Sequence, residues 1–173
     1  MEQLSAFLIP FIGLKDGIHP FDFKVDNTFF EGFDFFDFQN AHAEVDLVFE
    51  KKPTLLELNF TAKGQVRVPC DITTELFDLP IDTSFKLVVK FGVAEQFDDD
   101  EILILPHGTH EIQVAQYIYE MIVLSVPQKK VHPGIAKGTL KSEILEKLKE
   151  LQPQENPSSE DTDPRWDKLK DLL

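Results

Sequence analysis

The pattern of apolar and polar positions predicts a long run of strands in the first half of the chain. Apolar residues alternate with polar ones in 44–50 (EVDLVFE), 55–60 (LLELNF), 65–68 (QVRV) and 85–91 (FKLVVKF), and 76–81 is also rich in apolar residues. This period of two is typical of strands with one buried face. Turns are expected at Pro53 and at Lys63–Gly64. We therefore predict five or six antiparallel strands in series, a meander that is partly barrel-like.

The N-terminal segment predicts a hairpin. Residues 5–14 (SAFLIPFIGL) are an apolar run interrupted by Pro10, which suits an edge strand or a bulge. Residues 15–17 (KDG) have the composition of a turn, and residues 18–25 (IHPFDFKV) alternate as a returning strand.

A phenylalanine tract follows this hairpin. Eight of the 16 phenylalanines lie between residues 21 and 38, interleaved with aspartate and glutamate. Asp26 or Asn27 can cap a short helix in which four rings share one side at helical spacing, namely Phe29, Phe30, Phe33 and Phe36. The tract either packs into the core or forms an exposed acidic-aromatic patch for a partner. Core packing is favoured, because large exposed aromatic patches are uncommon.

A single central helix is predicted to cover the sheet. The apolar strand 102–105 ends at Pro106, and Thr109 is a candidate N-cap. From Ile112 apolar residues recur at helical spacing, and Leu124 helps to make the second half apolar nearly all round, which predicts a helix buried on several sides. Pro127 ends it.

The chain therefore divides into four parts. We expect a single α+β domain over 1–134, with the meander packed on the central helix, followed by a C-terminal helical appendage. In that appendage, residues 135–151 form an amphipathic helix, residues 152–163 (QPQENPSSEDTD) a flexible acidic linker and residues 164–173 a short helical docking peptide. The stripe of Trp166, Leu169 and Leu172 on this peptide suits a groove of this chain or of a partner.

The charge distribution disfavours a protein that binds mainly nucleic acid. The formal net charge is −14, and an acidic chain is repelled by phosphates. Residues 128–149 depart from this, with six lysines against two glutamates. A solvated helix face explains these lysines more simply than an RNA contact. No leader peptide or membrane-spanning run is evident, and there is one cysteine, so we expect a cytoplasmic protein that does not bind membranes.

Signs of catalysis are weak. His107 and His110, together with the acidic run 98–100, offer a conceivable metal site, but they are more simply histidines of a loop at a helix start. Cys70 has no second cysteine nearby. No glycine-rich phosphate loop or nucleophile elbow is present. We predict no enzyme activity, no cofactor and no bound metal.

The central stretch resembles a known family. Glu120, Leu124, Pro127 and His132 fit the E-x-x-x-L-x-x-P-x-x-x-x-H signature of YceD-like proteins, the large ribosomal RNA subunit accumulation proteins. The terminal DPRWDKLKDLL motif fits the same pattern, and the resemblance runs from about residue 43 to the C-terminus. Where that family usually has C-x-x-C, this chain has Cys70 and then Thr73, so a metal or redox role for such a pair does not carry over. The resemblance implies a non-enzymatic bacterial or plastid factor that supports accumulation or maturation of large-subunit ribosomal RNA.

The leading hypothesis is therefore a ribosome-biogenesis accessory factor. Its acidic body suits a basic ribosomal protein or assembly factor, with any ribosomal RNA contact limited to the lysines of 129–149. The candidate contact residues lie at the helix exit and in the terminal peptide: Pro127, Lys129, Lys130, His132, Arg165, Trp166, Leu169 and Leu172. The alternative is a barrel-like protein that encloses an apolar small molecule or lipid, with the phenylalanine tract lining or covering it. An enzyme that uses His107 and His110 is a third hypothesis.

Overall fold

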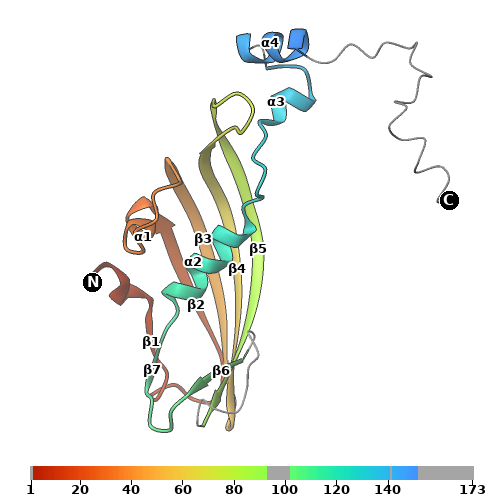
Figure 1. Cartoon of the computed structure of the whole chain (residues 1–173). Helices are drawn as coiled ribbons and strands as arrows, with labels where there is room; N and C mark the ends of the chain where they lie inside the picture. Colours follow the sequence, from red (N-terminus) through yellow and green to blue (C-terminus); the bar gives the residue numbers. More distant parts are fainter. Residues whose placement is uncertain (1, 93–101, 141, 152–173) are drawn as a thin grey trace, which may run out of the picture.

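The protein has an α+β fold, as the sequence predicts. A computed structural model describes residues 2–92, 102–140 and 142–151 (Figure 1). The elements in chain order are η1 (Glu2–Phe7), β1 (Leu8–Pro10), β2 (Gly17–Asp26), α1 (Asn27–Glu31), β3 (Asn40–Lys51), β4 (Leu55–Pro69), β5 (Leu76–Phe91), β6 (Ile102–Leu105), β7 (Glu111–Gln113), α2 (Ala115–Ser125), α3 (Pro133–Ala136) and α4 (Glu143–Leu151).

The predicted antiparallel meander is confirmed for β2 to β5, but the sheet is open, so the prediction of a partly barrel-like form is wrong. Its strand order is β2-β3-β4-β5-β6, with antiparallel pairing except between β5 and β6, which run parallel from Val88↔Ile102 to Phe91↔Leu105. The edge strands β2 and β6 do not pair with each other. Helices and the small β1–β7 sheet cover the apolar face instead, so burying that face does not require closure of the sheet.

Strand β4 runs unbroken through Lys63 and Gly64, where the sequence predicted a turn. Gly64 pairs with Ala43 of β3 in the continuous ladder. A Cβ atom built on Gly64 would overlap the carbonyl oxygen of His42 and lie 2.5 Å from the Cα of Ala43. The glycine therefore permits a close approach of the β3 and β4 backbones, a common reason for glycine inside a strand.

The predicted N-terminal hairpin is also wrong. The first apolar segment forms η1 and then β1, and β1 pairs with β7 through Leu8↔Gln113 and Ile9↔Ile112. Strand β2 pairs with β3 instead. Pro10 lies in β1, within a two-stranded sheet where a missing backbone donor costs little. Ile9 and Phe11 are buried against the main core, which draws this segment away from β2.

The core lies on one face of the main sheet, which the alternation predicted. Alternate residues of β3, from Ala41 to Phe49, and of β4, apart from Gly64, are buried, with Leu47, Phe49 and Leu58 fully inaccessible. Residues of the opposite face are mostly polar, and the four ion pairs found among the described residues join side chains of that face or of the adjoining β3–β4 turn. This pattern is typical of an antiparallel sheet with one buried and one solvent-exposed face.

Helix α2 packs on the apolar face of the sheet, and only one side of the helix is buried. Figure 1 shows it lying across the sheet, and it buries Ala115, Ile118, Met121 and Ile122. Leu124 is 82% exposed, so the prediction of burial on several sides is wrong. The predicted helix start is also wrong, since Ile112 belongs to β7. The hydroxyl of Thr109 donates to the carbonyl oxygen of Pro106 rather than capping a helix.

The phenylalanine tract combines core packing with exposure. Asp26 caps α1 as predicted, because its carboxylate accepts from the amides of Thr28 and Phe29. The helix ends at Glu31, however, and the chain then turns through Asp34, whose φ is +55°. Phe36 therefore does not share the helical face with Phe29 and Phe30, and is 67% exposed.

Helices α3 and α4 lie beyond one end of the sheet (Figure 1). The residues of α4 are all at least partly exposed. The predicted linker 152–163 and docking peptide 164–173 lie outside the described residues, as do the acidic residues 98–100 of the conceivable metal site. The division of the chain into a domain and three appended parts stays a prediction.

Replacing Gly64 by alanine is expected to destabilise the protein by about 1–3 kcal/mol, because the new methyl group must push apart the backbones of β3 and β4. Urea unfolding followed by circular dichroism measures this loss. The control is Gly13→Ala, where a Cβ meets no atom within 4 Å. Equal midpoints for the two variants would contradict the close-approach role of Gly64.

Candidate functional site

The candidate site lies where the β4–β5 turn meets the chain that leaves α2. The turn is closed by backbone bonds from the Cys70 amide to the Glu75 carbonyl, 2.9 Å, and from the Thr74 amide to the Cys70 carbonyl, 2.8 Å. Thr74 has a φ of +61°, a left-handed conformation that the tight turn imposes. The turn therefore presents Cys70 and Asp71 in a fixed geometry.

Asp71 holds the segment that follows α2. Its backbone amide donates to the carbonyl oxygen of Lys130 at 2.8 Å, and its carboxylate accepts from the amide of Lys130. These two bonds join residues 59 positions apart in the chain. They fix the backbone of Lys130, while its side chain stays partly exposed.

His132 is held by three contacts. Its amide donates to the Cys70 sulfur at 3.3 Å, and its Nδ1 accepts from the amide of Gly134 at 2.9 Å, which caps α3. Its ring meets the Phe77 ring edge-on, with centroids 5.4 Å apart. A Cβ on Gly134 would lie 2.9 Å from His132 Nδ1, so the histidine and the glycine fit only as a pair. These contacts give His132 a structural role in the start of α3.

The Cys70 thiol is buried in a ring of donors. It is 1% exposed. Burial raises its pKa, but hydrogen bonds from the Thr73 hydroxyl and from the amides of His132, Thr73 and Ile72 outweigh burial and lower the pKa to about 7. The Thr73 hydroxyl is itself buried next to this thiol, and it makes no regular hydrogen bond with any atom of the described residues. The Cys70 sulfur accepts from the amide of His132 and so ties the turn to that residue.

Two of the predicted contact residues line one groove. Pro127 and Lys130 form part of a groove of about 170 Å³, whose remaining lining residues are Phe35, Asp37, Phe38, Val68, Val123, Val126 and Gln128. Lys129 is exposed but does not line it. The other four candidates, Arg165, Trp166, Leu169 and Leu172, lie outside the described residues. The sequence did not predict that Phe35, Asp37 and Phe38 would face Pro127, although their acidic-aromatic composition marked them as a candidate partner patch.

Several lysines between residues 129 and 149 are available for contacts. Lys129, Lys137, Lys147 and Lys149 are exposed, and none of them forms an ion pair with a described residue. Across the described ranges, no group of three histidine, cysteine, aspartate or glutamate side chains has the arrangement to hold a metal ion. No helix in those ranges is long and apolar enough to cross a membrane.

Residues 58–173 match the family described as large ribosomal RNA subunit accumulation protein YceD, which is about two thirds of the chain. The chain belongs to this family. The match begins inside β4 and includes the β4–β5 turn, α2 and the segment through His132. The phenylalanine tract and strands β1 to β3 precede it. No curated protein and no solved structure matches this chain.

The Cys70 site predicts a pH-dependent contribution to stability. The folded pKa of about 7 lies below the ordinary value of 9.0, so the unfolded chain binds more protons between these pH values and the thiolate stabilises the folded state as pH rises. The melting temperature of the wild type relative to Cys70→Ser should therefore increase from pH 6 to pH 9. Serine is the matched control because its hydroxyl does not ionise in this range. A constant difference across the range would show that folding does not shift the pKa of the Cys70 thiol.

Proposed function

We propose that this member of the YceD family is a non-enzymatic factor that supports accumulation or maturation of large-subunit ribosomal RNA by binding a basic ribosomal protein or assembly factor. Family membership over residues 58–173 carries the proposal, because the family is described by its role in the accumulation of that RNA. Protein binding, rather than RNA binding, is the mode that the chain's charge favours.

The chain has a large and unevenly distributed excess of acidic over basic residues. The net charge of −14 repels a phosphate backbone and attracts basic proteins. Large-subunit ribosomal proteins are such basic chains, and complementary potentials both speed their encounter and select among them. We expect any RNA contact at the lysines of 129–149, of which Lys130 lines the groove at the exit of α2.

The apolar-ligand hypothesis loses its structural basis. It needed a barrel, and the sheet is open. Cavities along α1, α2 and the sheet have volumes of about 50 to 170 Å³, whereas pockets for drug-sized ligands are roughly 300–1,000 Å³.

The proposal is tested by capture of the tagged protein from its native cytosol, with and without ribonuclease, read by proteomics and RNA sequencing. Large-subunit ribosomal proteins should be enriched, and the enrichment should persist after ribonuclease treatment. Enrichment that disappears with ribonuclease would show that RNA is the direct partner. If neither large-subunit proteins nor precursor ribosomal RNA rise above background, the proposal fails.

Deleting residues 164–173 should lower this capture without lowering the melting temperature, because the terminal peptide is expected to dock on a partner. Trp166→Ala should have most of the same effect, and Asp167→Ala, on the other side of the predicted stripe, serves as the control. A large drop in melting temperature on deletion would instead show that the peptide is part of the fold.

A further inference from the structure

We propose that the end of α1 and the segment after it form a docking surface for an arginine-bearing segment of the basic partner. This inference rests on the proposed function and gives the binding a location. The surface, here called the acidic-aromatic loop, consists of Glu31, Asp34, Phe35, Phe36 and Asp37. It lies before residue 58 and so outside the part of the chain that matches the family.

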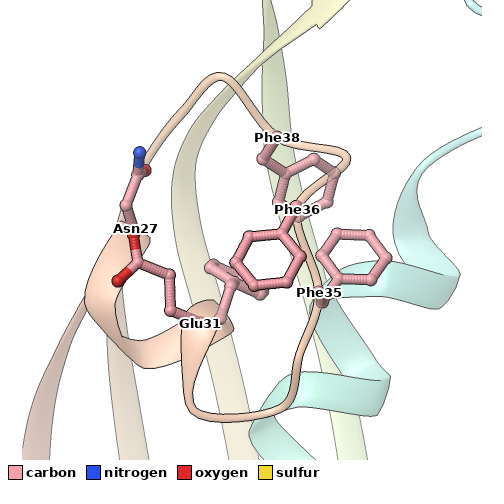
Figure 2. Close-up of a pocket in the computed structure, with 6 residues that line it drawn as sticks. Asn27, Glu31, Phe35, Phe36 and Phe38 are labelled. Atoms are coloured by element: carbon pink, nitrogen blue, oxygen red, sulfur yellow. The ribbon is translucent and has the colours of Figure 1, made fainter.

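Phe36 does not take part in the aromatic cluster that its neighbours form. Phe29, Phe30, Phe33, Phe35 and Phe38 all make ring contacts with one another or with α2. Phe36 makes no ring contact with any described residue and is 67% exposed. Figure 2 shows its ring beside Phe35 and Glu31 at a small hollow of about 50 Å³. Hydrophobic packing therefore accounts for the neighbours of Phe36 but not for Phe36 itself.

Carboxylates without ion-pair partners among the described residues lie close to Phe36 in the sequence. Glu31, Asp34 and Asp37 are all exposed, and none forms an ion pair or a side-chain hydrogen bond with a described residue. From residue 25 to residue 50 the sequence has seven acidic residues and no lysine or arginine. The local field therefore selects a cationic partner.

Arginine fits this combination better than lysine. Its planar guanidinium stacks on an aromatic face and bonds a carboxylate through two parallel N–H groups, whereas a lysine ammonium is a strongly hydrated point charge. One exposed ring flanked by three carboxylates within seven residues offers both kinds of contact to a guanidinium.

The loop is held in place before any partner binds. The Phe33 ring stacks on Tyr119 of α2 with centroids 4.5 Å apart and planes 13° from parallel, and Phe35 meets the same tyrosine edge-on at 5.7 Å. Phe35 and Phe38 also separate the hollow beside Phe36 from the groove that contains Pro127. A partner segment can run from the loop into that groove. Because the loop is already ordered, binding does not cost the conformational entropy of ordering it.

The test uses the full chain and two fluorescent dodecapeptides with four arginines or four lysines among glycine and serine, with binding read by anisotropy at low and physiological salt. The wild type should prefer the arginine peptide. Phe36→Ala should weaken that peptide about two- to fivefold and remove the preference. The triple variant Glu31→Gln/Asp34→Asn/Asp37→Asn should weaken both peptides about tenfold. Asparagine tolerates the left-handed backbone of residue 34, so this variant keeps the turn.

The matched control is Asp22→Asn/Asp46→Asn/Asp82→Asn, which makes the same change in net charge on exposed positions of the sheet's opposite face. It should bind like the wild type. Equal loss in both triple variants would show attraction by net charge alone and overturn the proposal. Arginine-peptide binding that appears only after deletion of 164–173 would show that the chain's own end occupies the surface, and would also overturn it.

The same variants separate this inference from the proposed function. If the wild type captures large-subunit ribosomal proteins and the Glu31/Asp34/Asp37 variant captures them equally well, the docking surface is wrong and the proposed function stands. If the wild type captures none of them but still prefers the arginine peptide through Phe36, the proposed function fails while the surface holds.

Discussion

The structure depends on covering one apolar face of an open five-stranded sheet. The side chains on that face include Val45, Leu47, Phe49, Leu58 and Ala62, all fully buried. Each large side chain removed from water contributes about 1.5–3 kcal/mol, so this face is the main source of folding free energy. Three separate pieces of chain cover it: α2, the β1–β7 ribbon, and the phenylalanine tract with α1. Their positions follow from the need to bury the sheet, and the groove that contains Pro127 lies where α2 meets the phenylalanine tract.

The strands were predictable because their signal is local. A period of two in 44–50 and 85–91 reports one buried face whatever the partners of the strand are, and the cap at Asp26 depends only on the next three residues. The errors came where a distant segment decides the outcome. Ile112 has helical spacing with the residues that follow it, yet it pairs with Ile9, about a hundred positions earlier. Gly64 resembles a turn residue until the neighbouring backbone at Ala43 is known.

The site, too, was predictable only where the signal is local in the sequence. Pro127 and His132 were singled out by a resemblance, and the chain does belong to that family. What the sequence could not show is why these positions are held, because the contacts of Asp71 with Lys130 and of Cys70 with His132 span about sixty residues. With Thr73 in place of a second cysteine, the thiol is left with hydrogen-bond donors only. Its contact with the amide of His132 ties the turn to the segment that begins α3.

The two interpretations of the phenylalanine tract were opposed as alternatives, and the structure shows why both features coexist. Helix α1 supplies Phe29 and Phe30, and the turn through Asp34 that follows it brings Phe33 and Phe35 onto Tyr119 while Phe36 stays outside this cluster. Once the loop is anchored on both sides of residue 36, that residue no longer contributes to the core and is free to face water. Carboxylates on the neighbouring positions keep such a ring soluble, since like charges on two copies of the chain repel. The acidic excess of the tract therefore has a physical reason in the monomer, and the same excess makes the exposed ring selective for a cationic partner over an apolar one.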